Sequence, residues 1–247
     1  MDKVDNKKGV LISKKFSIVC NFLIFMFSLL GFGLSCIFAV RDGYSHWFRR
    51  LLYFTQQSNL WIGITSLIFA IMLIVNKNNQ KQMLAISVFK YIFTVSITIT
   101  GIVFCTLLAP FADYDIWTFA TVLTHVVVPI FSIFDFFVNP YILKFDKKYR
   151  LFSIVPPFVY FVVTTILCLL NVDFGRGDAF PYFFFDFHSE AGLFGFVKGS
   201  PPQMGSVYWM IFLLGFIYLI SIVYYKIHVK LFDKRQNLGE NLEDVQK

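Results

Sequence analysis

Six long apolar segments constrain this chain more than any other feature of its sequence. A transmembrane helix needs about 20 consecutive, mostly apolar residues, and the chain has six such segments, at 16–40, 54–75, 83–109, 117–138, 151–170 and 205–227. Hydrophobic residues make up 57% of the chain, so no polar stretch is long enough for a separate soluble domain. The sequence therefore predicts an all-α fold, a polytopic membrane bundle of six transmembrane helices.

The basic residues indicate how this bundle is oriented. Lys and Arg gather before the first span, in the loops after the second and fourth spans, and after the sixth. Because cytoplasmic loops are enriched in Lys and Arg, we expect both termini in the cytoplasm. The expected organisation is a basic amino terminus at 1–15, a transmembrane domain at 16–227 and a polar cytoplasmic tail at 228–247. We expect the tail to be frayed from 234 onward, because it lacks a long apolar face.

Charge and composition bear on partners and localisation. A net charge of +7 would by itself suit nucleic acid or anionic lipid, but here the charges follow the membrane topology, so we expect a lipid bilayer and no nucleic acid. The abundance of Phe, Ile, Lys and Asn is typical of a low-GC bacterium, which suggests the bacterial plasma membrane. The four Cys lie inside apolar segments without the spacing of a metal site or a disulfide. We therefore expect no metal and no cofactor.

Polar side chains form a stripe on the fourth predicted span. At 100° per residue, Thr118, Thr121, His125 and Ser132 lie on one side of this helix, whose other faces are apolar. His125 is ~12 Å from the outer end of the span, at 1.5 Å per residue. An ionisable side chain at that depth is costly and by default functional. His125 is therefore a candidate catalytic residue, with a neutral histidine that bridges two helices as the alternative.

The second span carries a hydroxyl group at matching depth. Thr55 is near its outer start, Asn59 and Ser66 share the same face, and Ser58 lies at the edge of that face. A hydroxyl is a weak nucleophile unless a base removes its proton, and His125 is the base expected at similar depth. Thr55 and His125 are thus a candidate catalytic dyad. Asn59 and Ser66 could equally be polar contacts between helices.

A second polar pair is expected nearer the cytoplasm. Lys90 of the third span and Asp135 of the fourth lie at depths that permit contact. Each charge alone would cost roughly 2.5–3.5 kcal/mol at the centre of a membrane helix. We expect a structural ion pair, with Lys90 as an anchor for an acyl carboxylate as the alternative. The other histidines, His46, His188 and His228, are expected to face water in loops or at helix ends.

The longest connection, 171–204, contains an aromatic run at 180–187. Aromatic side chains favour the membrane interface over open water, so we expect this run to fold back over the outer mouth of the bundle as a lid. Asp186 from this run is one candidate to orient the imidazole of His125, and Asn59 or a tyrosine is another. Tyr182 and Arg176 are further candidate pocket residues, and the sequence does not choose among these alternatives.

Several of these residues fall into blocks that resemble a known family. The blocks, in chain order, are Phe54-Thr55-x-x-Ser58-Asn59-Leu60, then His125-x-x-x-Pro129 followed by Asp135, then Arg176-Gly177 followed by Phe180-Pro181-Tyr182-x-Phe184-x-Asp186. They resemble the signature blocks of a bacterial six-helix integral membrane family. That family is similar to the eukaryotic androgen-induced and androgen-dependent TFPI-regulating proteins, and the resemblance covers nearly the whole membrane domain.

The resemblance implies a function. The eukaryotic relatives are transmembrane threonine hydrolases that cleave fatty acid esters of hydroxy fatty acids with an intramembrane Thr and His, and these positions correspond to Thr55 and His125. The implied function is an intramembrane hydrolase of lipid-like, fatty acyl esters with a Thr/His dyad. The alternative is a non-catalytic membrane carrier or lipid-binding scaffold whose polar stripes line a cavity. A carrier usually shows broken helices or repeats, and no internal repeat stands out.

Overall fold

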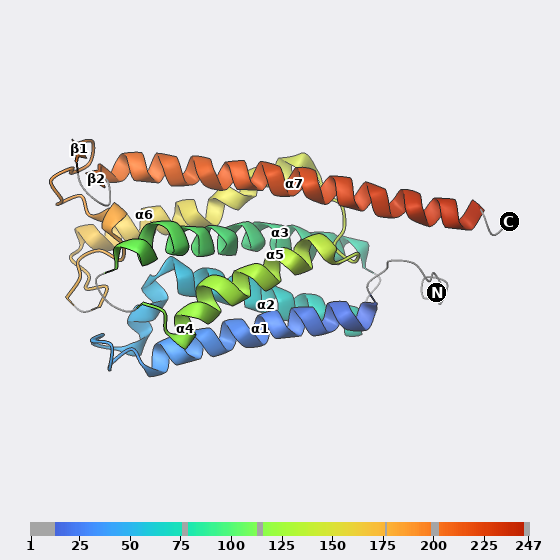
Figure 1. Ribbon diagram of the computed structural model, residues 1–247, viewed down its shortest axis with the longest axis horizontal. Coiled ribbons are helices and arrows are strands. Elements are labelled where there is room, and N and C mark those ends of the chain that lie inside the picture. The colour runs from blue at the N-terminus through green and yellow to red at the C-terminus, as the bar shows by residue number, and fades with distance from the viewer. Residues whose placement is uncertain (1–12, 76–78, 113–115, 176, 199–202, 245–247) are drawn as a thin grey trace.

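The computed structural model describes residues 13–75, 79–112, 116–175, 177–198 and 203–244. These residues include six helices that are long and apolar enough to cross a membrane, arranged as an all-α bundle (Figure 1). They also contain an antiparallel pair of two-residue strands, β1 (Phe196–Val197) and β2 (Gln203–Met204). The predicted fold class, a multi-pass bundle of six helices, is confirmed.

The first five spans have boundaries close to those predicted from hydropathy, and the sixth begins as predicted but extends further. The first two are α1 (Lys14–Ile37) and α2 (Phe54–Ile74), and the short 3-10 helix η1 (Trp47–Leu52) lies between them. The third is α3 (Gln80–Val103), continued by the π-helix η2 (Phe104–Leu108) and the 3-10 helix η3 (Ala109–Phe111). The fourth consists of α4 (Phe119–Val122), the π-helix η4 (Leu123–Val127) and α5 (Val128–Val138). The fifth joins the 3-10 helix η5 (Lys147–Ile154) to α6 (Val155–Leu169), and the sixth is α7 (Ser206–Asp244), preceded by the 3-10 helix η6 (Phe183–Phe185).

Polar side chains cap the first turn of four of the spans, the fifth through Asp146. Ser13 Oγ accepts a hydrogen bond from the N–H of Phe16 at 3.2 Å, at the start of α1. Asn79 caps α3 in the same way, and Thr118 Oγ1 accepts from the N–H of Thr121 at 3.2 Å, at the start of α4. Each cap satisfies a backbone donor that has no partner within the first turn of the helix.

The bundle is apolar on its outer surface and carries polar groups inside. Large apolar side chains are exposed on the spans, for example Val19 of α1, Ile64 of α2 and Val163 of α6. Many buried polar groups have partners within the protein; for example, the Tyr91 hydroxyl of α3 donates to the Ser221 carbonyl of α7 at 2.7 Å. Polar groups in a bilayer core need such internal partners, because no water is available there. This distribution suits a protein solvated by lipid.

The start of α1 and the end of α7 lie at the same end of the bundle (Figure 1). We call the opposite end, where the segments 38–53 and 179–198 lie, the distal end. The segments there carry few Lys and Arg, so the positive-inside rule predicts that the distal end faces outward. Packing alone does not distinguish the two sides of a membrane, so the cytoplasmic location of the termini stays a prediction.

The aromatic run at 180–187 folds back onto the distal end of the bundle. Phe184 and Phe185 are buried and pack with Tyr160 of α6 and Trp209 of α7. The ring of Tyr182 stacks on Phe184 with centroids 5.0 Å apart. The run therefore packs against the spans instead of extending into solvent, which agrees with the expected lid.

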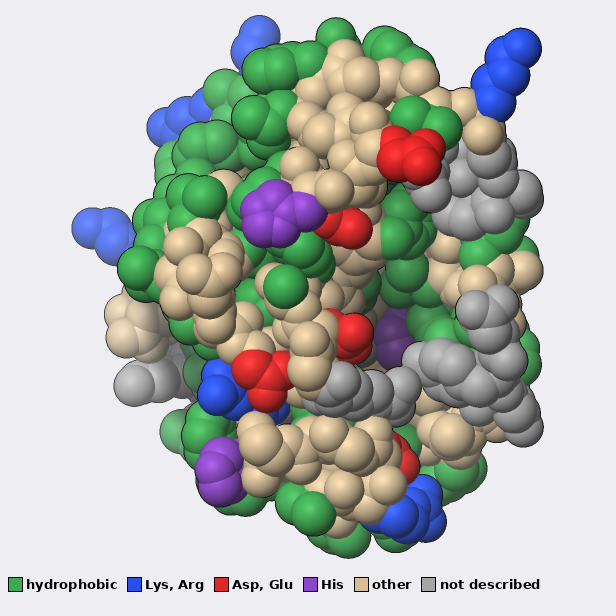
Figure 2. All heavy atoms as spheres, turned by 90° about the vertical axis from the view of Figure 1, so that its left-hand side faces the viewer, with side chains coloured by type: hydrophobic (Ala, Val, Ile, Leu, Met, Phe, Trp, Pro, Cys, Tyr) green, Lys and Arg blue, Asp and Glu red, His purple; other side chains and the backbone are tan. Residues whose placement is uncertain are grey.

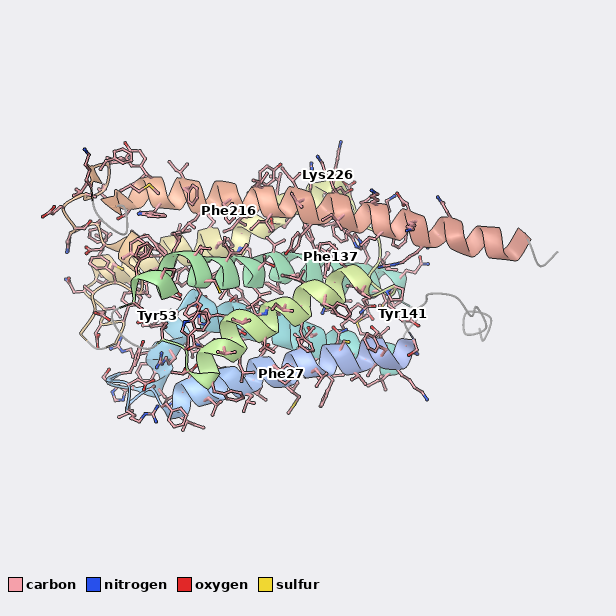
Figure 3. The ribbon with its side chains drawn as sticks, in the orientation of Figure 1. Phe27, Tyr53, Phe137, Tyr141, Phe216 and Lys226 are labelled. Carbon is pink, nitrogen blue, oxygen red and sulfur yellow. The ribbon has the colours of Figure 1, made fainter. Side chains whose placement is uncertain are left out.

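The carboxyl-terminal tail, expected to be frayed from 234 onward, is helical over 234–244, and residues 245–247 lie outside the described residues. α7 continues as one helix to Asp244 and projects beyond the other spans (Figure 1). Arg235 holds this extension by donating to the backbone carbonyls of Phe137 and Asn139, at the end of α5. Along α7, Lys226 points away from the bundle, whereas Phe216 packs against its core (Figure 3). A tertiary contact that the local sequence does not reveal thus joins the start of this polar segment to α5.

The expected solvent exposure of His228 is also wrong. His228 is 1% exposed, and its Nε2 donates to the Leu143 carbonyl at 3.2 Å. Its ring stacks on Phe145 with centroids 5.1 Å apart. Because α7 runs past the end of α5, a residue expected at a helix end becomes part of the interior.

Candidate active site

The structure brings Thr55 and His125 together near the distal end of the bundle. Thr55 lies in the first turn of α2 and is 8% exposed, and His125 lies in the π-helix η4 of the fourth span. Thr55 Oγ1 and His125 Nε2 are 3.2 Å apart, which is within hydrogen-bond distance. A hydroxyl and an imidazole that are 70 residues apart in the sequence therefore make direct contact.

Hydrogen bonding at the other ring nitrogen determines the tautomer of His125. His125 Nδ1 is 3.0 Å from the backbone carbonyl oxygen of Thr121. A carbonyl oxygen only accepts hydrogen bonds, so Nδ1 carries the proton and donates it to Thr121. In the neutral ring, Nε2 then has a free lone pair, and the Thr55 hydroxyl donates to it. A general base requires this arrangement.

Two π-helices meet at the site. The ring of Phe104, in η2, stacks on the imidazole of His125, in η4, with centroids 3.9 Å apart and 28° between the planes. A π-turn inserts one extra residue into a helix and frequently occurs at functional sites. Pro129 lacks an N–H, so it cannot donate to the carbonyl of His125 four residues earlier. The sequence after His125 therefore favours a local departure from the α-helix.

Asn59 and Ser58 fix the backbone beside the two candidate residues. Asn59 Nδ2 donates to the carbonyl of Thr55 at 2.8 Å and to the carbonyl of Thr124 at 3.0 Å. It thereby joins the residue that carries the hydroxyl to the residue just before His125. Ser58 Oγ donates to the same Thr55 carbonyl at 3.1 Å. Both side chains bond to backbone groups and not to the imidazole, so we describe them as positioning residues.

Gly101 lets α3 approach the fourth span closely. A Cβ atom at this position would lie 2.8 Å from the carbonyl oxygen of His125 and 3.3 Å from the side chain of Pro129. Protein interiors are close-packed, so any larger residue would push the two helices apart. The missing side chain at Gly101 thus helps to set the position of His125.

A cavity of about 730 Å³ reaches both candidate residues from the distal end, which is hollowed in the view of Figure 2. We call it the mouth cavity. Its wall includes apolar side chains, such as Phe38 and Phe119, and polar ones, such as Arg50. The Arg50 guanidinium is paired with Asp42, with 2.7 Å between Nη2 and Oδ2. The mouth cavity therefore combines apolar and charged surfaces.

Tyr182 is the tyrosine that the structure places beside the dyad. It lines the mouth cavity together with Thr55 and His125. Burial raises the pKa of the Tyr182 phenol, and hydrogen bonding to Thr55 opposes this rise. The phenol therefore stays protonated at neutral pH and can donate a hydrogen bond.

Asp186 was one candidate to orient the imidazole of His125, but the structure places the Thr121 carbonyl beside the imidazole instead. Asp186 Oδ1 accepts from the N–H of His188 at 2.9 Å, within its own turn. The contacts of His125 Nδ1 are the Thr121 carbonyl and the Thr124 hydroxyl, each at 3.0 Å. The Thr121 carbonyl thus occupies the position expected for an acid. Arg176, the remaining candidate pocket residue, lies outside the described residues.

Lys90 and Asp135 meet in the interior of the bundle. Lys90 Nζ lies 2.6 Å from Asp135 Oδ2, with the two side chains 0% and 2% exposed. Nζ also donates to Asn21 Oδ1 at 2.6 Å and to Ser66 Oγ at 3.0 Å. All three ammonium N–H donors thus have acceptors in the protein. This network joins the first four spans and favours the structural ion pair over the carboxylate anchor.

The sequence gives little indication of the groups that surround the imidazole. Thr121 belongs to the polar stripe of the fourth span, but it acts through its backbone carbonyl, which no side-chain pattern marks. The spacing of four residues between Thr121 and His125 is the one available signal. Phe104 is one of 33 Phe in the chain, so nothing in the sequence distinguishes it.

Comparison with protein-family models, curated proteins and solved structures finds no match for this chain. Function must therefore be argued from the geometry of the site. In the described part of the chain, no group of three or more His, Cys, Asp or Glu side chains could hold a metal ion.

Proposed function

We propose that this protein is an intramembrane hydrolase of lipid-like esters, with Thr55 as nucleophile and His125 as general base. The observation that carries the proposal is the 3.2 Å contact between Thr55 Oγ1 and His125 Nε2, with Nδ1 bonded to the Thr121 carbonyl. This arrangement supplies a hydroxyl, a base and a group that orients the base, the three parts of an activated nucleophile. The resemblance to transmembrane threonine hydrolases, which act on fatty acyl esters, supports the same two residues.

The reaction has two steps. Thr55 Oγ1 attacks the ester carbonyl carbon while its proton passes to His125 Nε2; the bond from that carbon to the alcohol oxygen breaks, and His125 gives the proton to this oxygen. Water then attacks the acyl-threonine ester and gives a proton to His125, the bond from the acyl carbon to Oγ1 breaks, and Oγ1 regains a proton. One ester and one water thus become one carboxylic acid and one alcohol.

Tyr182 supports the proposal as a hydrogen-bond donor. Negative charge develops on the ester carbonyl oxygen during each attack, and a donor already in place stabilises that charge. The Tyr182 phenol lies in the cavity wall beside Thr55 and, because its pKa is raised by burial, keeps its proton. We therefore assign Tyr182 to the stabilisation of the oxyanion.

Kinetics of matched variants test the proposal. The protein, purified into nanodiscs, is assayed against fatty acyl esters and simple acyl esters. Thr55→Val and His125→Ala should each remove nearly all hydrolysis, and the double variant should lose little more, because the two residues act as one unit. Thr55→Ser keeps the hydroxyl and should retain part of the activity.

Thermal unfolding of each variant provides the control for folding. Normal turnover by folded Thr55→Val would exclude Thr55 as the nucleophile. Inactivity of the wild-type protein toward every ester would favour the alternative function, a lipid-binding scaffold or carrier in which Thr55 and His125 are part of a cavity wall.

A further inference from the structure

Thr55 separates two cavities of different size. The mouth cavity, of about 730 Å³, lies on the side of Thr55 that contains His125. On the other side, a cavity of about 50 Å³ is bounded by side chains of α3, α6 and α7, and we call it the inner pocket. Thr55 and Tyr182 line both cavities, whereas His125 lines the mouth cavity and not the inner pocket.

The inner pocket is lined by hydrocarbon. Apart from four residues with hydroxyl groups, its lining side chains are aliphatic or aromatic. The Tyr160 hydroxyl donates to the Leu52 carbonyl at 3.1 Å, and the Thr100 hydroxyl lies within hydrogen-bond distance of the Ser58 hydroxyl, at 2.8 Å, and of the Ser96 carbonyl, at 3.2 Å. These two hydroxyls are therefore occupied by the protein itself. Beyond Thr55 and Tyr182, the pocket offers apolar contact and suits a hydrocarbon group.

The chemistry of the proposed reaction determines which part of the ester each cavity receives, and the inference rests on that proposed function. His125 must return its proton to the leaving alcohol oxygen, so this oxygen has to lie on the Nε2 side of Thr55 Oγ1. The alcohol part then extends into the mouth cavity. The acyl part lies on the other side of the carbonyl carbon and enters the inner pocket.

The size of the inner pocket limits the acyl group. A cavity needs ~10–15 Å³ for each water-sized group, so about 50 Å³ holds roughly three to five such groups. We infer that the substrate carries a short acyl group, on the order of two to four carbons, on a larger alcohol. The mouth cavity, whose lining includes Phe38, Phe119 and Arg50, suits an amphipathic alcohol. The lipid-like part of the substrate is thus its alcohol.

A series of acyl lengths tests this assignment. p-Nitrophenyl acetate, butyrate, octanoate and palmitate have the same leaving group, and each is assayed with the protein in nanodiscs. We expect kcat/KM to be highest for acetate or butyrate and to fall by about tenfold or more at octanoate, because exclusion of even one methylene is worth roughly that factor.

Variants of the pocket wall should change this preference. Leu213→Ala shortens a buried side chain that α7 contributes to the inner pocket, and should raise the ratio of octanoate to butyrate kcat/KM by about fivefold or more. Ile217→Val, a smaller change in the same wall, should raise it less. Leu219→Ala is the matched control, because Leu219 is 55% exposed on the same helix and should leave the ratio unchanged.

The outcomes separate this inference from the proposed function. Thr55-dependent hydrolysis that increases toward palmitate, or a ratio that Leu213→Ala and Ile217→Val do not change, would overturn the short acyl group and leave the hydrolase in place. Hydrolysis of no ester, or hydrolysis that persists in Thr55→Val, would overturn both. The series of acyl lengths with the wild-type protein tests the preference for a short acyl group even if a variant of the pocket wall does not fold.

Discussion

At the scale of single residues, a backbone carbonyl accepts the hydrogen bond from the imidazole that an acidic side chain often accepts in soluble hydrolases. His125 donates to the Thr121 carbonyl, and Asn59 donates to the carbonyls of Thr55 and Thr124. A carbonyl orients an imidazole without adding a second ionisable group, which would be costly at this depth in a membrane. The site therefore depends on the positions of backbone groups, and these can be changed from a neighbouring side chain.

Asn59→Asp should reduce both activity and stability although the two side chains have nearly the same shape. A carboxylate cannot donate to the Thr55 and Thr124 carbonyls, and each buried group left without a partner costs about 1–3 kcal/mol. Thermal unfolding and kcat measure the effect. Asn79→Asp is the control, because Asn79 is exposed and caps α3 as an acceptor, a role that Asp also fills. An Asn59→Asp variant with wild-type kcat would show that these bonds do not position the dyad.

At the scale of secondary structure elements, the third and fourth spans meet through two π-helices and one glycine. Phe104, in η2, stacks on His125, in η4, and the missing side chain of Gly101 allows the two spans to approach closely. Hydropathy over about 20 residues is a strong signal, so the spans themselves could be predicted. A π-turn adds one residue and has no composition of its own, so the sequence predicts a regular helix at 117–138 instead.

Gly101→Ala should lower the free energy of unfolding by about 1–3 kcal/mol, the usual cost of overpacking, and should also reduce turnover. Its methyl group would lie 2.8 Å from the His125 carbonyl and displace the imidazole. Gly33→Ala is the matched control: its Cβ atom would meet no atom within 4 Å, and Ala favours a helix over Gly by about 1 kcal/mol. Similar effects of the two substitutions on stability and kcat would rule out this close approach as a constraint on the site.

At the scale of the whole molecule, one buried charge network joins the spans that carry the site. Lys90 is ten residues before Thr100, which lines the inner pocket. The charge network therefore lies ~15 Å from that part of the site along the third span. The contact between Lys90 and Asp135 could be predicted because depth along a span follows from residue number. The partners Asn21 and Ser66 could not, because sequence does not give the rotation of one helix against another. The pairing of Thr55 with His125 could be predicted from their depths and from the sequence motif. The contact of His125 with the Thr121 carbonyl could not.

Replacing one member of the Lys90 and Asp135 pair should destabilise the bundle more than replacing both. Lys90→Met or Asp135→Asn alone leaves an unpaired charge in the interior, at a cost of about 3–5 kcal/mol, whereas the double variant leaves no charge there. A double-mutant cycle on thermal unfolding measures the coupling. Additive losses would show that the two charges do not stabilise each other. Ester hydrolysis should persist in a folded double variant, because neither residue lines the mouth cavity or the inner pocket.

Labelling with a fluorophosphonate tests the central claim most directly, because this reagent forms a covalent adduct with an activated hydroxyl nucleophile. We expect the protein in membranes to be labelled, and mass spectrometry of its peptides to locate the adduct on Thr55. Folded His125→Ala should not be labelled, because no base then removes the Thr55 proton. An adduct on a different residue, or labelling that persists in Thr55→Val, would contradict the account.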